Sequence, residues 1–229
     1  MKKPQYLTLS QFLTGATVFE GGLLVVAFLL GWLVNISPTA QLTWSWKDFG
    51  LGVAATSPML LVLAAGWMSK LNGMQQIREL VRNLLGPFLV RCRLLDMLFL
   101  ALLAGVCEEV LFRGLLYAFL DQWSNTLAVV VSSVMFALAH AVTPFYTFFA
   151  GVMGLYLCAL MAMDQTPNLL IPITAHTLYD FAGIILIARD YRGHQTRPAA
   201  DNAEAQEERP DEPDSSETPA EESDQISEW

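Results

Sequence analysis

Six stretches of predominantly apolar residues follow one another along the chain, each close to the length that a helix needs to cross a bilayer. About 20 apolar residues, rising about 1.5 Å each, span the hydrocarbon core of a membrane. The pattern predicts an all-α fold, a polytopic membrane bundle of about six transmembrane helices. The six stretches cover residues 17–36, 49–68, 94–119, 126–143, 145–163 and 168–188.

The segment between the second and third stretches has a different pattern. From Lys70 to Arg93, apolar residues recur at helical spacing and alternate with charged residues. This pattern predicts an amphipathic helix that lies on the membrane surface. The apolar residues are Ile77, Leu80, Val81, Leu84 and Leu85. The charged residues that lie between them in sequence are Arg78, Glu79 and Arg82.

The composition agrees with a membrane protein. Of the 229 residues 54% are hydrophobic and 15% are charged, which excludes a chain disordered throughout. The three cysteines, Cys92, Cys107 and Cys158, each lie in or beside an apolar stretch, so they predict no disulfide framework. No basic and aromatic surface pattern indicates a nucleic-acid partner.

The net charge of −9 comes from the C-terminal end of the chain. Residues 1–200 carry 12 basic and 10 acidic side chains, whereas residues 201–229 carry one basic and 12 acidic side chains. The end is rich in Pro, Ser and Glu, so it cannot bury enough apolar surface to offset its chain entropy. We expect a transmembrane helix bundle over residues 1–190 and a disordered acidic cytoplasmic tail over residues 191–229.

The distribution of basic residues predicts the orientation in the membrane. If both termini lie in the cytoplasm, eleven Lys and Arg residues fall on the cytoplasmic side, Lys47 alone falls on the other side, and Arg113 lies inside a span. Such an asymmetry is typical of cytoplasmic loops. We expect an integral, multi-pass protein of a bacterial plasma membrane with both termini in the cytoplasm.

Ionisable residues within the predicted spans are the candidates for chemistry. A charged side chain at bilayer depth costs about 2.5 to 3.5 kcal/mol on insertion scales, so such residues usually face the bundle interior and have a function. Glu20, by contrast, is expected near the start of the first span, at the interface. The candidate site residues are Glu108, Glu109 and Arg113 in the third span, His140 at the end of the fourth, and His176 and Asp180 in the sixth.

Helical geometry assigns different partners to the two adjacent acids. Glu109 and Arg113 are four residues apart, which predicts an ion pair on one helix face. Glu108 lies about 140° away from Arg113 and needs a partner on another helix, for which His140, His176 and Asp180 are the candidates. His176 and Asp180 are also four apart and share one face.

Three interpretations of these residues stay open from the pattern alone. In the first, His140, His176 and Asp180 bind Zn²⁺ and Glu108 acts as general base on a metal-bound water. In the second, Glu108 and His140 activate water without a metal, while His176 and its neighbour stabilise the oxyanion. In the third, the residues form a structural polar network or a proton relay.

Three motifs in the third to sixth spans resemble the CPBP family of CAAX prenyl proteases and bacteriocin-processing peptidases, also called type II CAAX endopeptidases or the Abi family. EEVLFRG (Glu108–Gly114) is similar to the family's EExxxR signature, FALAH (Phe136–His140) to its FxxxH, and HTLYD (His176–Asp180) to its Hxxx(N/D). Their order and spacing agree over about residues 91–186.

The resemblance implies an intramembrane metalloendopeptidase that cleaves a membrane-associated peptide or protein in the lipid bilayer. It further implies that Glu108 activates water, that Glu109 and Arg113 support it, and that His140, His176 and Asp180 complete the site. Many members have Asn where this chain has Asp180, and an ionised carboxylate cannot donate a hydrogen bond to an oxyanion. Asp180 is therefore better suited to zinc ligation, or to the orientation of His176, than to stabilising an oxyanion.

The rival hypotheses are a catalytically silent member that acts as a membrane scaffold, chaperone or immunity protein, and a proton-coupled transporter. A transporter is expected to show internal repeats, and none is apparent in the sequence. The chain also lacks the HExxH, GxSG and GxGD motifs of other intramembrane proteases.

Nothing indicates an oligomeric state. The aromatic residues of the fifth span, Phe145, Tyr146, Phe148 and Phe149, are expected to form lipid-facing and packing surface.

The predicted spans leave one conflict in depth. Counting about 1.5 Å per residue from the cytoplasmic end of each span, Glu108 lies about 22 Å deep and His140 only about 5 Å deep. Either the fourth span is bounded wrongly, or the segment 126–163 is tilted or partly re-entrant.

Overall fold

The computed structural model describes residues 7–161 and 167–207, and their side chains as far as residue 195. Over this part of the chain every regular element is a helix, which confirms the predicted all-α class. The chain divides into two units, Met1–Arg192 and Gly193–Trp229. The elements are α1 (Leu9–Leu33), α2 (Trp46–Met68), α3 (Asn72–Leu89), α4 (Leu94–Glu109), the π-helix η1 (Val110–Tyr117), α5 (Ala118–Asp121), α6 (Asn125–Ala139), α7 (Pro144–Met161) and α8 (Leu170–Glu207).

Each of the six predicted spans corresponds to a helical segment of the first unit. Four helices are long and apolar enough to cross a membrane: α1, α2, α7 and the Leu170–Gln195 part of α8. The third span is built from α4, η1 and α5, which follow one another without a break, and the fourth is the shorter α6. The amphipathic helix expected from Lys70 to Arg93 is α3.

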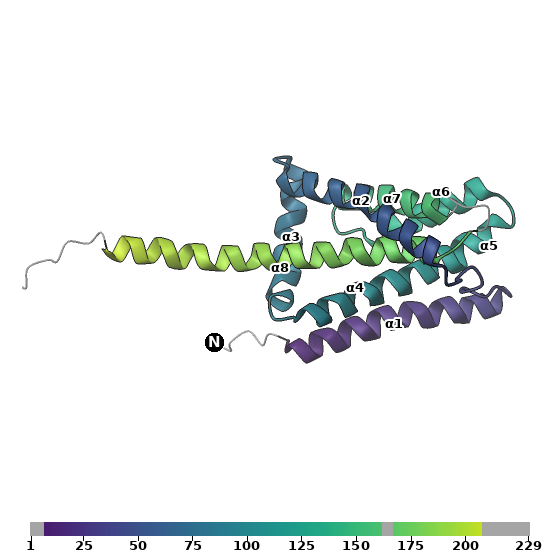
Figure 1. Ribbon diagram of the computed structural model, residues 1–229, viewed down its shortest axis with the longest axis horizontal. Coiled ribbons are helices and arrows are strands. Elements are labelled where there is room, and N and C mark those ends of the chain that lie inside the picture. Colours follow the sequence, from purple (N-terminus) through teal and green to yellow (C-terminus); the bar gives the residue numbers. More distant parts are fainter. Residues whose placement is uncertain (1–6, 162–166, 208–229) are drawn as a thin grey trace, which may run out of the picture. The chain divides into compact units, whose positions relative to one another are not determined.

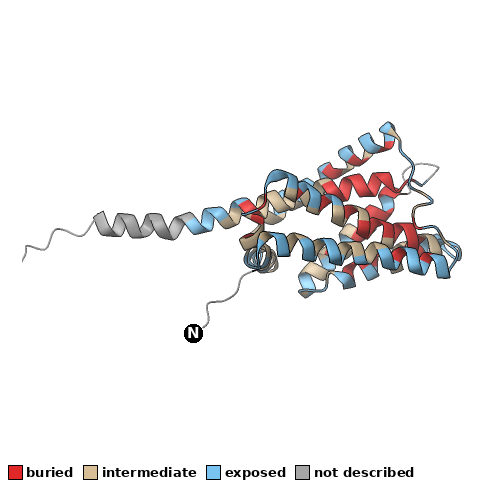
Figure 2. Cartoon of the chain, turned by 90° about the horizontal axis from the view of Figure 1, so that it is seen from below, coloured by how far each residue is buried: buried red, intermediate tan, exposed pale blue. Residues whose placement is uncertain are grey.

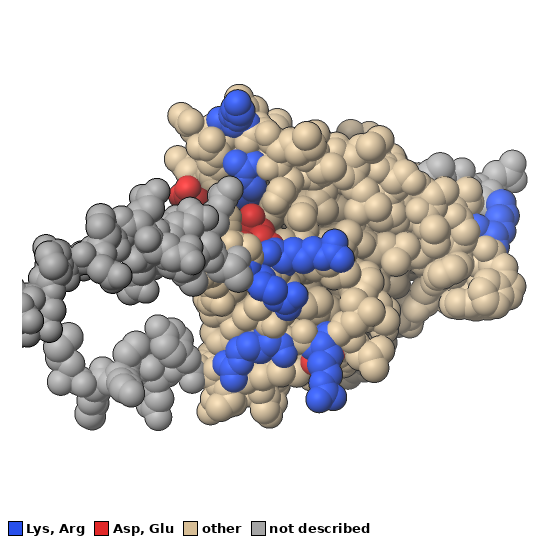
Figure 3. Space-filling view, turned by 60° about the vertical axis from the view of Figure 1, so that its left-hand side comes forward, with Lys and Arg blue, Asp and Glu red and all other residues tan. Residues whose placement is uncertain are grey.

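The crossing helices lie side by side, and α3 runs across one end of them (Figure 1). The space-filling view toward that end shows several Lys and Arg side chains gathered on it (Figure 3). Arg78 of α3 donates hydrogen bonds to the carbonyl oxygens of Gly66, Trp67 and Ser69, which lie at the C-terminal end of α2. The surface helix is therefore fastened to the end of a spanning helix.

The first helix begins earlier than its apolar stretch, and this corrects the position expected for Glu20. Thr8 and Gln11 form a reciprocal capping box that starts α1 at Leu9. Glu20 therefore lies near the middle of the helix and not at the interface. Its Oε2 atom is buried and has no hydrogen-bond partner among the described residues.

The last helix extends beyond the predicted boundary at residue 190. α8 continues to Glu207, where the sequence from Ala199 is rich in Ala, Glu and Gln, residues of high helix propensity. Residues 191–207 are thus helical in the structure, whereas a disordered tail was expected. Residues 208–229, the rest of that tail, lie outside the described residues.

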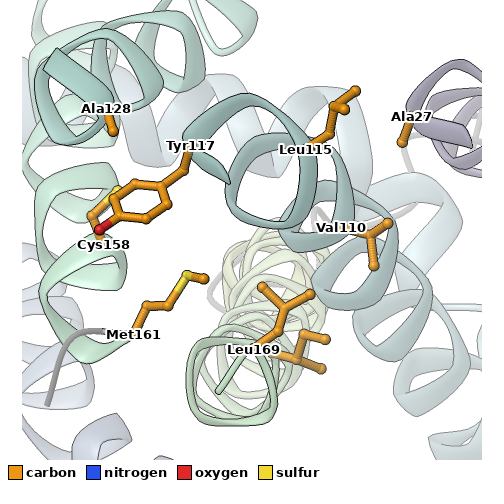
Figure 4. Close-up of a cluster of buried hydrophobic side chains, with 9 residues drawn as sticks. Ala27, Val110, Leu115, Tyr117, Ala128, Cys158, Met161 and Leu169 are labelled. Carbon is orange, nitrogen blue, oxygen red and sulfur yellow. The ribbon is translucent and has the colours of Figure 1, made fainter. Parts of the chain in front are cut away.

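The core of the first unit is concentrated around η1 and the first turns of α8, where buried positions cluster (Figure 2). Val110, Leu115 and Tyr117 of η1 pack with side chains from four other segments (Figure 4). The motif EEVLFRG therefore lies in the best-packed part of the bundle. The remaining members of this cluster are Ala27, Ala128, Cys158, Met161, Leu169 and Ile173.

Candidate active site

A fully buried ion pair forms the base of the site. Glu109 is the last residue of α4 and Arg113 lies one turn later in η1, and both side chains are 0% exposed. Arg113 Nη1 donates to Glu109 Oε1 at 2.8 Å, and Nη2 donates to the carbonyl oxygen of Gly154 in α7 at 3.0 Å. The pairing expected from the i,i+4 spacing is confirmed, and the arginine also ties α7 to η1.

His176 of α8 joins this pair through the same carboxylate. Its Nδ1 lies 2.9 Å from Glu109 Oε1. Because that oxygen also accepts from Arg113, Glu109 is the acceptor and Nδ1 carries the hydrogen. His176 Nε2 faces Asp180 Oδ2, one turn along α8, at 3.5 Å. We call Glu109, Arg113 and His176 the inner cluster.

Glu108 and His140 meet on the other side, as one of the expected pairings. His140 Nε2 lies 3.7 Å from Glu108 Oε2, and the side chains are 24% and 12% exposed. His140 follows the last residue of α6, and its Nδ1 lies 2.9 Å from the carbonyl oxygen of Phe136. Since a carbonyl only accepts, Nδ1 carries a hydrogen, and when the ring is neutral Nε2 presents a lone pair. We call Glu108, His140 and Asp180 the outer cluster.

The pairing of Glu108 with His140 resolves the conflict in depth. α6 has 15 residues and ends at Ala139, so it is shorter than the span expected over 126–143. His140 therefore lies in the turn between α6 and α7 at the level of Glu108. The predicted boundary of the fourth span was wrong because the apolar run continues through Ala141 and Val142 after the helix has ended.

Phe136 connects the two clusters. Arg113 Cζ lies 4.6 Å from the centre of its ring, a cation–π distance. The rings of His140 and His176 lie 4.5 and 5.9 Å away, centroid to centroid. The aromatic residue of the FALAH motif therefore positions both histidines, in addition to packing against Phe112 at 5.2 Å.

The helix carrying Glu109 and Arg113 changes to π-helical hydrogen bonding directly after Glu109. Such i→i+5 segments are rare and often occur at functional sites. Gly114 lies in this segment against the carbonyl oxygen of Pro38, so close that a side chain on Gly114 would collide with it. The glycine of the EEVLFRG motif thus lets the loop after α1 approach the π-helix.

Two adjoining cavities lie beside the outer cluster. The smaller, of about 60 Å³, is lined by His140, His176 and Asp180 among others. The larger, of about 300 Å³, extends between α2, α3, α7 and α8, with a mostly apolar lining. The two cavities share four lining residues: Tyr146, Phe149, Tyr179 and Asp180.

Three of these shared residues were missed or misassigned from the sequence. Tyr146 and Phe149 were expected to belong to lipid-facing or packing surface, which holds for Phe148 at 70% exposure but not for these two. Tyr179 lies between His176 and Asp180 in sequence and was not considered. Spacing along α8 alone could have suggested it, because residues 176, 179 and 180 are neighbours on a helix.

The structure thus brings all six predicted site residues together, from the end of α4, from η1, from the turn after α6 and from α8. Glu20 of α1 is a seventh ionisable residue within the bundle, and its Oε2 atom is buried without a hydrogen-bond partner among the described residues. Sequence reasoning placed Glu20 at the interface because the apolar run starts at Val18, so the hydropathy pattern gave no sign of its depth.

The predicted zinc ligands do not form a ligand group in the structure. Across residues 7–161 and 167–195, no set of three His, Cys, Asp or Glu side chains is arranged to hold a metal ion. His176 Nε2 and Asp180 lie together, but the nearest acid to His140 Nε2 is Glu108, and Glu108 was assigned as the base. The residues therefore do not fit the three-ligand zinc site as predicted.

Comparison with known families identifies the segment that contains the site. Residues 91–182 match the family model described as Rce1-like, type II CAAX prenyl endopeptidase Rce1-like. The match includes all three motifs and confirms the resemblance over this segment. No curated protein matches the chain. No solved structure matches it either. The family match and the long apolar helices indicate an integral membrane protein.

Proposed function

We propose that this protein is an intramembrane endopeptidase that hydrolyses a peptide bond of a membrane-associated peptide or protein with a water activated by Glu108. The match of residues 91–182 to a protease family supports the reaction class. The observation that carries the mechanism is the position of Glu108 Oε2, which faces His140 Nε2 at 3.7 Å and is buried without a hydrogen-bond partner among the described residues.

These two atoms form a water-activating pair. Both accept hydrogen bonds, since the hydrogen of neutral His140 is on Nδ1 and an ionised carboxylate has none. Two acceptors 3.7 Å apart cannot satisfy each other, but one water molecule can donate a hydrogen to each. The oxygen of that water then keeps its lone pairs for attack, and the two bases hold it in a fixed orientation.

The reaction proceeds in two steps. In the first, the water oxygen bonds to the scissile carbonyl carbon, one water proton passes to Glu108, and the carbonyl oxygen becomes an oxyanion. In the second, the carbon–nitrogen bond breaks and Glu108 returns the proton to the leaving amine, so that the carboxylate is regenerated. The inner cluster takes no proton in this scheme. Within it, Glu109 and Arg113 position His176 and anchor the helix that bears Glu108.

This scheme needs no metal. The competing hypothesis is a site in which His140, His176 and Asp180 bind zinc. A metal would activate the water as a Lewis acid. The chain's own pairings favour the metal-free scheme, because His140 faces Glu108 and Asp180 faces His176. Elemental analysis of active protein distinguishes the two.

The site's surroundings support a substrate that reaches the enzyme through the membrane. The larger cavity adjoins Asp180 and has a mostly apolar lining from α2, α3, α7 and α8. A peptide with an apolar segment or a lipid modification matches this lining. We further propose that the end of the bundle covered by α3 faces the cytoplasm, because Arg78, Arg82, Arg91 and Arg93 lie on or next to α3.

The activity can be tested in phosphatidylcholine proteoliposomes with internally quenched peptides that contain one C-terminal CaaX sequence. One peptide has a farnesylated cysteine and its partner has an unmodified cysteine. We expect cleavage by the parent protein and a loss of at least about 100-fold in kcat with Glu108→Gln, since general base catalysis contributes about 10² to 10⁴.

The matched control is Glu79→Gln, which changes an acid of the surface helix α3 and leaves the clusters intact. Equal rates for parent and Glu108→Gln proteins would overturn the assignment of the base. No cleavage of either peptide, with a correctly folded parent, would favour the catalytically silent scaffold. A preference for the farnesylated peptide would identify a prenylated substrate class.

The orientation is tested with single cysteines in a variant that lacks the three native ones. Positions 44 and 72 lie on the two sides of α2, in the loop before it and at the start of α3. A membrane-impermeant thiol reagent applied to intact cells should label position 44 and leave position 72 unlabelled. The reverse labelling would contradict a cytoplasmic α3.

A further inference from the structure

The proposed reaction creates an oxyanion, and the two clusters supply no obvious donor for it. Many members of the family that the motif resembles have Asn at the position of Asp180. An ionised Asp180 can only accept hydrogen bonds, whereas an amide can also donate them. His140 and His176 both have their Nδ1 hydrogen engaged, with the carbonyl oxygen of Phe136 and with Glu109 respectively. His140 Nε2 faces Glu108, and His176 Nε2 faces Asp180 at 3.5 Å, so that any hydrogen on His176 Nε2 is directed to that carboxylate.

From this we infer that the hydroxyl of Tyr146 stabilises the oxyanion, a role that the amide of an Asn at position 180 would otherwise fill. This inference rests on the proposed function. Tyr146 lies in the first turn of α7 and lines both the smaller cavity, together with His140, His176 and Asp180, and the larger one. Its ring lies 6.2 Å from that of His140, edge to face.

The environment of Tyr146 suits a donor to developing negative charge. Tyr146 lines the smaller cavity together with Asp180, and its ring lies beside His140, whose Nε2 faces Glu108 at 3.7 Å. No hydrogen bond ties its hydroxyl to any other described residue, which leaves the hydrogen available for a substrate. A preorganised donor of this kind stabilises a tetrahedral intermediate without reorganisation at the moment of reaction.

Tyr179 is the other phenol on the shared wall of the cavities and the main rival for this role. It lines both cavities beside Asp180, but the ring contact with His140, which faces Glu108, is made by Tyr146. The oxyanion forms on the carbon that the Glu108-activated water attacks. Of the two phenols, Tyr146 is therefore the one close to the reacting atoms.

The test is the variant Tyr146→Phe, which removes the hydroxyl and keeps the ring against His140. With the internally quenched peptide in proteoliposomes, kcat should fall about 100-fold or more while KM changes little, because an oxyanion donor contributes about 10² to 10³ in kcat. The matched control is Tyr156→Phe in the same helix. Tyr156 lies outside the two cavities and donates to the carbonyl oxygen of Ala55.

A second variant separates the role of a donor from a structural role. Asp180→Asn introduces an amide that can donate, so adding Tyr146→Phe to Asp180→Asn should cost about tenfold or less, against about 100-fold in the parent background. Additive losses would mean that Tyr146 acts elsewhere. A rise in KM alone, or a large loss of kcat with Tyr179→Phe and not with Tyr146→Phe, would overturn the inference.

The parent protein separates this inference from the proposed function. If the parent cleaves neither peptide, the proposed function fails and the inference fails with it. If the parent is active and Tyr146→Phe keeps its kcat, only the inference fails, and a protonated His176 becomes the donor in its place.

Discussion

The inner and outer clusters each contain a glutamate and a histidine, and they differ in how tightly their side chains are held. In the inner cluster, Glu109 and Arg113 are fully buried and the contacts are 2.8 and 2.9 Å long. In the outer cluster, the contacts made by His140 and by Asp180 are 3.7 and 3.5 Å long. The exposed fractions of the outer side chains range from 12% for Glu108 to 29% for Asp180.

The difference indicates a division of work between two adjacent acids. An ionised carboxylate at 0% exposure is stable only if its charge is paired, and Glu109 accepts two hydrogen bonds on one oxygen. Its geometry is therefore fixed by the fold. Glu108 has an oxygen without a hydrogen-bond partner among the described residues, beside a cavity-lining histidine, which supports its proposed role in activating water.

The largest expected effect on stability comes from breaking the inner pair. Glu109→Gln leaves Arg113 as an uncompensated buried charge, and we expect the free energy of unfolding to fall by about 3 to 5 kcal/mol. Glu108→Gln should change it by less than about 1 kcal/mol, because the outer contact at 3.7 Å is not a hydrogen bond. Reversible unfolding in mixed micelles measures both.

The double variant Glu109→Gln with Arg113→Met provides the control. Replacing both charges removes the unpaired cation, while the amide still offers an oxygen to His176, so part of the lost stability should return. If Arg113→Met instead adds its own full loss, the two charges do not act as a pair. Equal destabilisation by the Glu108 and Glu109 variants would remove the distinction between the clusters.

A smaller effect, on activity, is expected from Asp180→Asn in the outer cluster. Asp180 faces His176 Nε2 at 3.5 Å, beyond a good hydrogen bond, so we expect turnover to stay within about tenfold, corresponding to about 1.4 kcal/mol. Strong chelators should leave the parent enzyme active. Elemental analysis should show no zinc lost with the substitution. A joint fall of metal content and turnover would instead support the zinc hypothesis.

Features set by local spacing were predictable from the sequence. Apolar runs gave the spanning segments, the period of the 70–93 segment gave α3, and the i,i+4 spacing gave the Glu109–Arg113 pair and the shared face of His176 and Asp180. Each of these depends only on residues within a few turns of one another, where a helix of known geometry fixes the neighbours.

Features that depend on other segments were not predictable. The π-helical turn after Glu109 accompanies a close approach of Pro38 to Gly114, two residues far apart in sequence. Hydropathy placed the end of α6 too late because apolar residues favour a membrane whether or not they are helical. Tyr146 was assigned to packing surface because its neighbours are aromatic, and only the fold shows that its side of α7 faces His140.

The smallest effect is expected from an ion pair of the same chemistry outside the clusters. Arg82 of α3 and Asp190 of α8 lie 3.4 Å apart, with side chains 20% and 21% exposed. Water and salt screen such a pair, so a double-mutant cycle with Arg82→Ala and Asp190→Ala should give a coupling energy of about 0.2 to 1 kcal/mol that falls with added salt. The same cycle with Glu109→Gln and Arg113→Met should give a larger coupling energy, insensitive to salt. Similar values for the two cycles would show that burial is not what separates the inner cluster from an ordinary surface contact.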